Sequence, residues 1–554
     1  MATFVQNCYT SIKSKLNGEL QGNFQEAGVK WMLNREDPSN DVRGGFLCDD
    51  VGMGKTNQMT AVIVGNQLDK PTLVFTLVAT VGHWRDTLRN FGNLNTIVLK
   101  ANFKGTIPAS CKVVVAPYSL VQSPGLNTVP SVLRRQWGRI VLDEGHVIRN
   151  PKTKVNKMIS ELKRDIMWIL TATPIQNSMN DMLSLAKTIG ITSNNAEHII
   201  DNYFLRRRSD EELTLPPLST HVVRIPFSDP AEQKLYEAVN DIFMERLCAV
   251  ENNDSKFRNT AIEGIMRLRQ VCAHPIVLFD AIKGKKKLNN LRRLQKSGVK
   301  RKFIDDSDSD DSTESDSDAC TFSQHKPSAY YKHLNELDAL EVGLEELVAH
   351  LVKRGVDIND HEKIFGSKVN FLISDLLKYH KLNSETQDDT QNNTITKSLV
   401  FCSFRSEADV IAKHLDENGI SYIPFDGSMD KNDKESAIDN FQSTDVEVML
   451  LQIKCGSTGL NLQAASRVYI MTPNYNPCID IQAVGRSHRK GQTQAVECIR
   501  LVIENTIDDK CLGISNNKLE VITNALKENN YLNKLGGASA MGDLTNADLK
   551  ALFA

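Results

Sequence analysis

The 554-residue sequence lacks several features that would assign it to a whole class of proteins. Its formal net charge is only −2, so a polyanion would have to bind a local basic surface. The 11 cysteines include no Cys-x-x-Cys pair, and Cys48, Cys111 and Cys402 stand in apolar runs, which favours buried, reduced thiols over zinc sites or disulfides. No apolar run is long enough to span a bilayer and no secretory h-region opens the chain. We therefore expect a protein that stays inside the cell and binds no membrane.

Hydrophobic residues make up 41% and charged residues 24% of the chain, a composition typical of a globular protein. The length allows three or four domains of ordinary size. Apolar runs rich in Val, Ile and Leu alternate with amphipathic segments from 60 to 175 and from 366 to 515. This pattern predicts two α/β blocks, each with a parallel sheet covered by helices on both faces. The expected strands are 72–78, 112–116, 139–143 and 167–171, then 398–403, 446–451, 467–471 and 497–502.

The region between the two blocks differs from both. From about 205 to 300 it is charged and is predicted to form an all-helical insertion. Residues 283–302 are basic and residues 305–318 are almost purely Asp and Ser, so both stretches are predicted to be disordered. The basic clusters fit a nuclear localisation signal, a nucleic-acid contact or a plain solvated tether. The Ser-Asp repeats could accept phosphate, which would add negative charge beside the basic run.

A phosphate-binding loop is predicted between 44 and 56. The apolar run Phe46–Cys48 breaks into a glycine-containing turn, and Lys55 and Thr56 open a predicted helix. Glycines expose backbone N–H groups to an anion, the helix N-terminus adds partial positive charge, the lysine reaches terminal phosphates and the threonine can ligate Mg²⁺. Asp49 stands where the loop consensus has its first glycine. From this loop alone, a chance Gly-Lys-Thr turn is the alternative.

Two carboxylates, Asp143 and Glu144, end a later apolar run. They follow the loop by roughly 90 residues, which is ordinary for P-loop ATPases. Asp143 is expected to hold Mg²⁺ and Glu144 to orient or deprotonate the attacking water, although such a pair alone could be an ordinary turn. Thr171 also ends an expected strand. Because the carboxyl ends of parallel strands meet at one edge of a sheet, these groups and the loop are expected to lie together.

The second block contributes arginines. Gln482, Arg486 and Arg489 recur at helical spacing, so one helix face presents an amide and two guanidinium groups. Such a face is often merely solvated, but arginine also suits the spread charge of a transferring phosphoryl group. The first block has the parts of an ATPase except an arginine finger, and the second has arginines without a phosphate loop. We therefore expect ATP hydrolysis to require the two blocks to meet.

In this order, the motifs resemble those of the Snf2 family of helicase superfamily 2 ATPases. The resemblance covers the chain from about Gln21 to Asp508 except the linker. The matching segments are a Q-type motif at Gln25, motif I at Gly44–Thr56, a DEAH-like motif II at Asp143–His146, motif III at Thr171–Asn177, motif V at Gly456–Leu462 and motif VI at Gln482–Gln492. Hallmarks of this family within the superfamily are matched by Asn476-Pro477, Gly491-Gln492 and Leu268–Pro275.

The resemblance implies an α/β fold with two RecA-like lobes and with ATP and Mg²⁺ in the cleft between them. The implied domains are an N-terminal lobe (1–204), a helical insertion (205–300), an acidic linker with a helical connector (301–365), a C-terminal lobe (366–515) and a tail (516–554). The residues expected to bind ATP are Gln25, Asp49, Asp50, Val51, Gly52, Met53, Gly54, Lys55, Thr56 and Gly459. The residues expected in catalysis are Lys55, Asp143, Glu144, Gln482, Arg486 and Arg489, with Thr56 and Asp143 as Mg²⁺ ligands.

The sequence departs from the family pattern at some positions without losing a catalytic group. Asp50 replaces Glu, Ala172 replaces Gly, Tyr475 replaces Trp, Lys434 replaces Arg, and residues 76–82 lack the proline of motif Ia. The residues expected to contact DNA are Arg206, Arg207, Trp84 and Ser119. Little of the chain lies outside the motor, which resembles the viral members of the family, including the global transactivators of large DNA viruses.

The resemblance implies an ATP-driven motor that moves along double-stranded DNA and remodels or displaces nucleosomes or other DNA-bound proteins in transcription or repair. A strand-separating helicase and a non-catalytic DNA-bound regulator are the alternatives. Leu268–Pro275 argues against the first, and the complete set of catalytic residues argues against the second. We expect a monomer in the nucleus, which would be the host nucleus for a viral protein, with the cytoplasm as the alternative.

Overall fold

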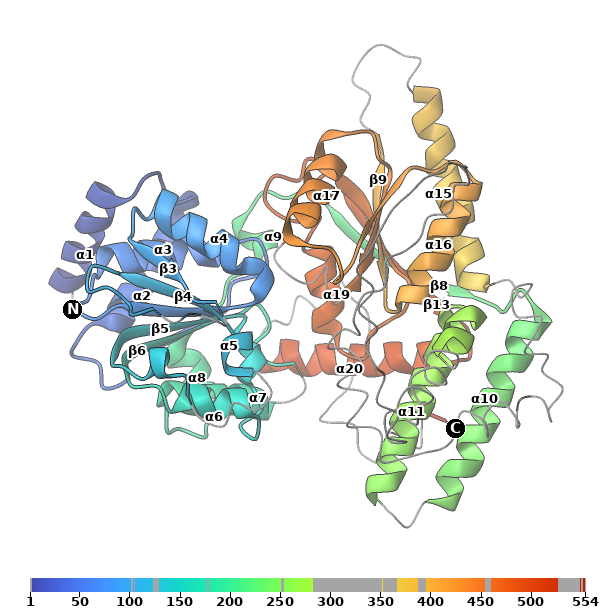
Figure 1. The fold of residues 1–554 in the computed structure, drawn as a ribbon, viewed down its shortest axis with the longest axis horizontal. Coiled ribbons are helices and arrows are strands. Elements are labelled where there is room, and N and C mark those ends of the chain that lie inside the picture. Colours follow the sequence, from blue (N-terminus) through green and yellow to red (C-terminus); the bar gives the residue numbers. More distant parts are fainter. Residues whose placement is uncertain are drawn as a thin grey trace, which may run out of the picture. The chain divides into compact units, whose positions relative to one another are not determined.

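The computed structural model of the chain contains two sheets and the helices around them (Figure 1). By its internal contacts the chain divides into two compact units. The first comprises Met1–Arg224, Ile373–Val502 and Asp508–Thr545, and the second comprises Ile225–Leu372, Ile503–Ile507 and Asn546–Ala554. The residues that the structure describes are 2–100, 103, 105–122, 129–176, 179–250, 254–281, 351, 366–386, 395–453, 460–526, 549 and 552–553.

The first sheet has seven strands in the order β3-β4-β2-β5-β6-β1-β7, and all neighbouring strands are parallel. The strands are β1 (Gly44–Leu47), β2 (Thr72–Thr76), β3 (Thr96–Val98), β4 (Val113–Pro117), β5 (Trp137–Asp143), β6 (Arg164–Leu170) and β7 (Phe204–Leu205). The four strands expected in this block are β2, β4, β5 and β6, so the prediction of a parallel α/β block is confirmed.

Both faces of this sheet are covered, because successive residues of a strand point to opposite faces. In β5, Ile140 and Leu142 enter one apolar cluster and Val141 enters the other. The helices on the Val141 face are α1 (Ala2–Lys15), α2 (Gly22–Glu36), α3 (Lys55–Gly65) and α4 (Val81–Asp86). Those on the other face are α5 (Ser119–Gln122), α6 (Lys154–Ser160), α7 (Met179–Ile189) and α8 (Ala196–Tyr203). Short helical turns lie at η1 (Val78–Thr80), η2 (Thr87–Phe91), η3 (Ser131–Leu133), η4 (Gly145–Ile148) and α9 (Ser209–Glu212).

The second sheet has six strands in the order β10-β11-β9-β12-β13-β8, and the neighbours from β10 to β13 are parallel. The strands are β8 (Leu218–Ile225), β9 (Lys397–Cys402), β10 (Tyr422–Phe425), β11 (Val448–Gln452), β12 (Ala465–Ile470) and β13 (Val496–Ile503). The accompanying helices are α15 (Ser367–Thr386), α16 (Arg405–Glu417), α17 (Lys431–Ser443), α19 (Pro477–Val484) and α20 (Ile507–Ala525). The four strands expected in this block are β9, β11, β12 and β13, so a second α/β block is also confirmed.

The expectation that the chain is all-helical from about 205 is wrong at its beginning. Residues 218–225 form β8, which adds to the edge of the second sheet. The segment has alternating β-branched residues after Pro216-Pro217, a pattern that favours a strand. The helices of the insertion begin later, with α10 (Pro230–Ala249) and α11 (Asp254–Ala273) in the second unit. In that unit, the buried Glu232 of α10 accepts hydrogen bonds from the backbone N and the hydroxyl of Ser367.

Some predictions concern residues outside the described ones. The basic and acidic linker stretches, most of the C-terminal tail, Asn177 and Gly459 are among them. For the described part of the chain, no helix has both the length and the apolar content that crossing a bilayer requires.

Candidate nucleotide-binding site

The loop that follows β1 has the shape required for binding an anion. Gly52 and Gly54 have φ values of 85° and 75°, in the left-handed region that residues with a side chain rarely adopt. A Cβ on Gly54 would lie 2.4 Å from Nε2 of Gln25. α3 begins directly after this turn at Lys55, so the positive end of its dipole faces the loop. Strand, turn and helix N-terminus thus follow one another as in a phosphate loop.

The donors of this loop fit a nucleoside triphosphate. Nζ of Lys55 donates hydrogen bonds to the backbone oxygens of Asp49 (2.6 Å) and Asp50 (2.9 Å). The ammonium group is therefore held over the loop by oxygen acceptors, and phosphate oxygens are acceptors of the same kind. Thr56 follows in the first turn of α3, where its hydroxyl is available as an oxygen ligand for Mg²⁺ together with the carboxylate of Asp143.

Gln25 is an integral part of the loop's support. Its side chain is only 1% exposed. Nε2 donates to the backbone oxygen of Met53 (3.0 Å), and Oε1 accepts from the backbone N of Gln21 (2.8 Å). Gln25 is therefore a buried support of the loop and not an exposed surface residue. Its contact with ATP stays a prediction.

Asp143 lies at the carboxyl end of β5 and is held by two donors. Its carboxylate accepts hydrogen bonds from Oγ1 of Thr76 (2.7 Å) and from Nε1 of Trp84 (2.8 Å). Burial and the negative charge of Glu144 raise the pKa of Asp143 to about 6, although the two hydrogen bonds oppose this rise. The hydroxyl of Tyr118 donates to the backbone oxygen of the same residue (2.9 Å). Side chain and backbone of Asp143 are both fixed in orientation.

Glu144 occupies a strained backbone position beside it. Its φ of 49° lies in the left-handed region, which is uncommon for a residue with a Cβ and is often found at functional sites. Its carboxylate lies 3.3 Å from Nδ1 of His146 and 3.5 Å from Oγ1 of Thr171. Burial alone would raise the pKa of Glu144, but the hydrogen bond and charge of His146 and the charges of Lys55 and Arg486 outweigh it, so the pKa is lowered. An ionised carboxylate is the form that a general base requires.

The arginines of motif VI lie in the same compact unit as this acidic pair. Arg486 is buried, and burial lowers its pKa to about 10 although the charge of Glu144 acts in the opposite direction. Arg489 lies against the phosphate loop, since a Cβ on Gly52 would be 2.9 Å from the Cβ of Arg489. Gln482 is buried in α19. The structure therefore brings Arg486 and Arg489 to the residues around Lys55, whereas Gly459 lies outside the described residues.

The prediction that Trp84 contacts DNA is wrong. Its side chain is 0% exposed, and its indole N–H is directed to Asp143. Trp84 is the buried residue of α4, and its side chain belongs to the apolar cluster on the Val141 face of the sheet. Ser119 is exposed at the start of α5 after β4, so it stays a candidate for a DNA contact.

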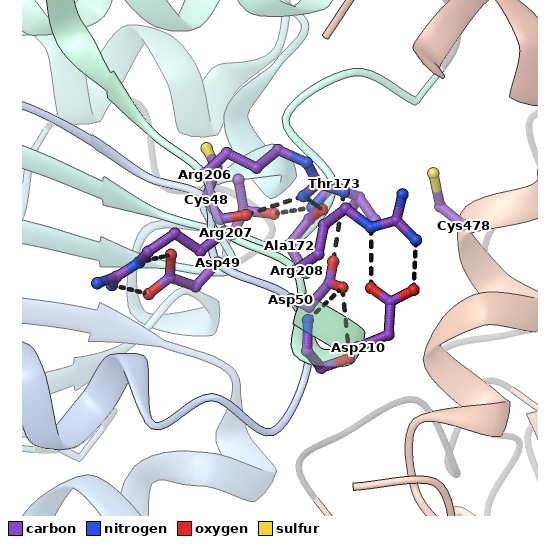
Figure 2. A network of polar contacts seen from close by, with 12 residues as sticks. Cys48, Asp49, Asp50, Ala172, Thr173, Arg206, Arg207, Arg208, Asp210 and Cys478 are labelled. Carbon is purple, nitrogen blue, oxygen red and sulfur yellow. Dashed lines mark hydrogen bonds and ion pairs between the residues drawn. The ribbon is translucent and has the colours of Figure 1, made fainter. Parts of the chain in front are cut away.

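The same prediction for Arg206 and Arg207 stays a prediction, and their contacts within the protein weigh against it. Their side chains are only 16% and 12% exposed, because both bind groups beside the phosphate loop (Figure 2). Arg207 pairs with Asp49, and Arg206 pairs with Asp50. The two aspartates that pair with these arginines lie more than 150 positions earlier in the sequence, at 49 and 50. Little of either guanidinium group is left to bind a DNA phosphate.

Three supporting residues were missed in the sequence. Thr76 and Tyr118 hold Asp143, and Gln58 donates to the carboxylate of Asp49 (2.9 Å). Thr76 ends β2 and Tyr118 follows β4. For Thr76 and Tyr118, a polar residue at the end of a buried strand was the available signal, because the carboxyl ends of parallel strands share one edge. Gln58 lies inside α3 and gave no such signal.

Comparison with known proteins places two family models on the chain. The SNF2-related domain matches residues 24–202, and the helicase conserved C-terminal domain matches residues 377–491. The first range contains the phosphate loop and the acidic pair, and the second contains the arginines of motif VI.

Several curated proteins are similar over most of the chain. The human helicase-like transcription factor is 28% identical over 70% of this chain and 43% of its own length. The DNA repair protein RAD5B of Arabidopsis thaliana is 26% identical over 88% and 46%. The TATA-binding protein-associated factor MOT1 of Saccharomyces cerevisiae is 23% identical over 92% and 27%. The chain thus spans less than half the length of these relatives.

Among solved structures, a SWI2/SNF2 ATPase core from Sulfolobus solfataricus in complex with double-stranded DNA matches 95% of this chain and 98% of its own at 18% identity. The TM-score of 0.35 is too low to support any conclusion from this match.

Proposed function

Because the chain belongs to the Snf2-related ATPases of helicase superfamily 2, we propose that it hydrolyses ATP in order to move along double-stranded DNA. The observation that carries this proposal is the meeting of residues from the two matched domains. Arg486 lies close enough to Glu144 for their charges to interact, and Arg489 lies against Gly52 of the phosphate loop. A site completed by both domains can link hydrolysis to their relative movement.

In this proposal each residue of the site has a definite task. Lys55 binds the terminal phosphates, and Thr56 and Asp143 offer oxygen ligands to Mg²⁺, which supplies positive charge to the triphosphate when it is bound. Glu144 orients or deprotonates the attacking water. Arg486 and Arg489 stabilise the charge that develops during phosphoryl transfer. Gln482 positions this arginine pair from the preceding helix turn.

The proposed partners are duplex DNA and the proteins bound to it. The relatives are named as a transcription factor, a DNA repair protein and a TATA-binding protein-associated factor. We infer that the chain displaces or remodels DNA-bound proteins, nucleosomes among them, in transcription or repair. The nucleus is the proposed location, which agrees with the basic clusters of the linker sequence. DNA affinity is expected to fall with salt concentration, because contacts to phosphates release counterions.

The proposal predicts that duplex DNA stimulates ATP hydrolysis. Phosphate release is measured with and without a blunt duplex, at equal protein and Mg²⁺ concentrations. Lys55→Ala serves as the blank for contaminating ATPases and is expected to hydrolyse no ATP in either condition. Equal turnover by the wild-type protein and the Lys55→Ala variant would disprove the ATPase assignment. Wild-type turnover that is independent of DNA would disprove the DNA-driven motor alone.

Movement and strand separation require separate assays. A translocating motor is expected to displace the third strand of a DNA triplex while leaving the underlying duplex intact. Displacement of a strand from a tailed duplex would instead identify a strand-separating helicase. Absence of both activities in a DNA-stimulated ATPase would contradict translocation.

The hydrogen bond from Trp84 predicts a smaller effect on turnover. Trp84→Phe keeps an aromatic ring in the core but removes the donor to Asp143, and since hydrogen bonds to charged groups contribute about 1.5–3 kcal/mol, we expect kcat/KM for Mg-ATP to fall roughly tenfold. Trp137→Phe is the matched control. Trp137 is equally buried, and its N–H donates to the backbone oxygen of Leu133 (3.1 Å), away from the acidic pair. Equal losses of activity in both variants would show that Trp84 serves packing alone.

A further inference from the structure

The phosphate loop carries two adjacent carboxylates, Asp49 and Asp50, at the place where the loop consensus begins with a glycine. ATP bears several negative charges, so unpaired carboxylates beside its phosphates would weaken its binding. The side chain of Asp49 is 0% exposed and therefore gains little screening from water. A phosphate loop with this sequence requires a source of positive charge in addition to Lys55.

The pairing of β7 with β1 places this positive charge beside the phosphate loop. β7 pairs in parallel with β1, with Phe204 beside Phe46 and Leu205 beside Leu47. The pairing continues past both strands, because the backbone N of Cys48 donates to the oxygen of Leu205 (2.7 Å) and the N of Asp50 donates to the oxygen of Arg207 (3.1 Å). Consecutive arginines after β7 therefore run alongside consecutive aspartates after β1.

Arg207 neutralises the first aspartate. Its Nε donates to Oδ1 of Asp49 (3.0 Å), and its Nη2 donates to Oδ2 of the same carboxylate, a two-point contact typical of arginine (Figure 2). The same guanidinium group donates to Oε1 of Gln58 in α3 (2.8 Å) and to the backbone oxygen of Phe24 in α2. One side chain thus joins the loop to the helix that precedes it and to the helix that follows it.

Arg206 donates hydrogen bonds to the second aspartate and to the backbone at the ends of two strands. Its Nη1 donates to the backbone oxygens of Cys48 (2.8 Å) and Ala172 (3.0 Å), and its Nη2 donates to Oδ1 of Asp50 (3.3 Å). The other oxygen of Asp50 accepts from the backbone N of Ser209 (3.1 Å). The ends of β1 and β6 are therefore tied to the segment that leads towards β8.

We propose that Arg206 and Arg207 are positioning residues. They neutralise Asp49 and Asp50, so that the phosphate loop can bind a highly charged nucleotide. The proposal rests on the proposed ATP-binding function. It adds two residues to the site and a preference for nucleotides with more phosphates. Removing a positive charge beside the loop leaves a negative charge there, and the resulting repulsion grows with the charge of the ligand. The pairs therefore favour triphosphates over nucleotides with fewer phosphates.

The test compares the affinities of ATP, ADP and AMP, each measured by competition with a fluorescent ATP analogue. In Arg207→Gln we expect the Kd for ATP to rise roughly tenfold, with a smaller rise for ADP and the smallest for AMP, as Coulomb repulsion scales with charge. The double variant Asp49→Asn with Arg207→Gln removes both charges and is expected to recover ATP affinity to within roughly threefold of the wild-type value.

Arg208→Gln is the matched control. Arg208 belongs to the same run and is buried, and its guanidinium group pairs with Asp210. Its replacement is expected to leave the ratio of the ATP and AMP affinities unchanged. If Arg207→Gln does not fold, the less buried pair Arg206→Gln and Asp50→Asn is tested in the same way.

Any one of the following results would overturn the inference. The first is an equal loss of affinity for all three nucleotides, which would indicate general damage to the loop. The second is no recovery in the double variant. The third is weaker DNA binding at unchanged ATP affinity, which would restore Arg207 as a DNA contact. A wild-type protein that binds no ATP would disprove the proposed function together with the inference, whereas intact wild-type binding with an unaffected Arg207→Gln variant would disprove the inference alone.

Discussion

Glu144→Gln is expected to lower kcat for ATP hydrolysis by roughly 10² to 10⁴-fold, the usual contribution of a general base. Glutamine preserves the shape of the side chain and can still bind a water molecule, but it cannot accept a proton. The effect should be large because the surroundings of Glu144 keep it ionised, with His146 providing the strongest opposition to burial. ATP binding should persist, since Lys55 and the loop glycines are unchanged. The measurement is steady-state turnover with saturating duplex DNA and Mg-ATP, together with a direct binding titration.

A control for this change is Glu161→Gln. Glu161 is exposed beyond the end of α6 and makes no part of the site, so its replacement should leave kcat within about twofold of the wild-type value. Turnover by Glu144→Gln at more than about a tenth of the wild-type rate would contradict the role of general base. If ATP binding were lost together with turnover, Glu144 would instead contribute to the binding of ATP before hydrolysis.

Glu36→Gln is expected to destabilise the first sheet and its helices by about 3–5 kcal/mol, because it leaves a buried arginine without its counter-charge. Glu36 ends α2 and is 0% exposed. Its carboxylate accepts from Nε of Arg139 in β5 (2.6 Å), from Nε1 of Trp168 in β6 (2.8 Å) and from Nδ2 of Asn66 (2.7 Å). It also accepts from Nη2 of Arg139. This one residue therefore joins a helix to two central strands.

Urea unfolding followed by tryptophan fluorescence can measure this effect in one part of the chain. The protein has 4 tryptophans, and all of them lie at or before position 168. Glu26→Gln in the same helix is the matched control. The ion pair of Glu26 with Lys30 (3.7 Å) is largely exposed and worth about 0–1 kcal/mol, and a glutamine oxygen can still accept the hydrogen bond that Tyr9 makes with this side chain. Adding Arg139→Met to Glu36→Gln removes the unpaired charge and should recover part of the loss. Equal costs for Glu36→Gln and Glu26→Gln would contradict a structural role for the buried pair.

The phosphate loop and the acidic pair could be predicted from the sequence because their signals are contiguous. Lys55 and Thr56 follow a glycine turn within a few residues, and Asp143 and Glu144 end an apolar run. Such local patterns depend on backbone geometry and periodicity, which any short stretch carries with it. The two alternating blocks were accessible for the same reason, since a strand that is buried on both faces must be apolar along its whole length.

The partners of the Trp84, Arg206 and Arg207 side chains could not be predicted in this way. All three were expected to contact DNA. Trp84 instead donates to a carboxylate 59 positions later, and Arg207 pairs with a carboxylate 158 positions earlier. Burial of a polar group depends on the partner that meets it, and a partner so distant in sequence leaves no local trace. The strand β8 was missed because its pairing partner, β13, also lies far away.

The sequence alone determined the two α/β blocks, the glycine turn before Lys55, and the presence of acidic groups in one block and arginines in the other, since hydrophobic periodicity and turn chemistry act over neighbouring residues. Only the tertiary structure decided that three residues expected to contact DNA support the site from within. The physical reason is that the parallel pairing of β7 with β1 sets arginines beside aspartates, and the ends of β2 and β5 bring Trp84 to Asp143. Those contacts exist only after the strands have taken their order in the sheet.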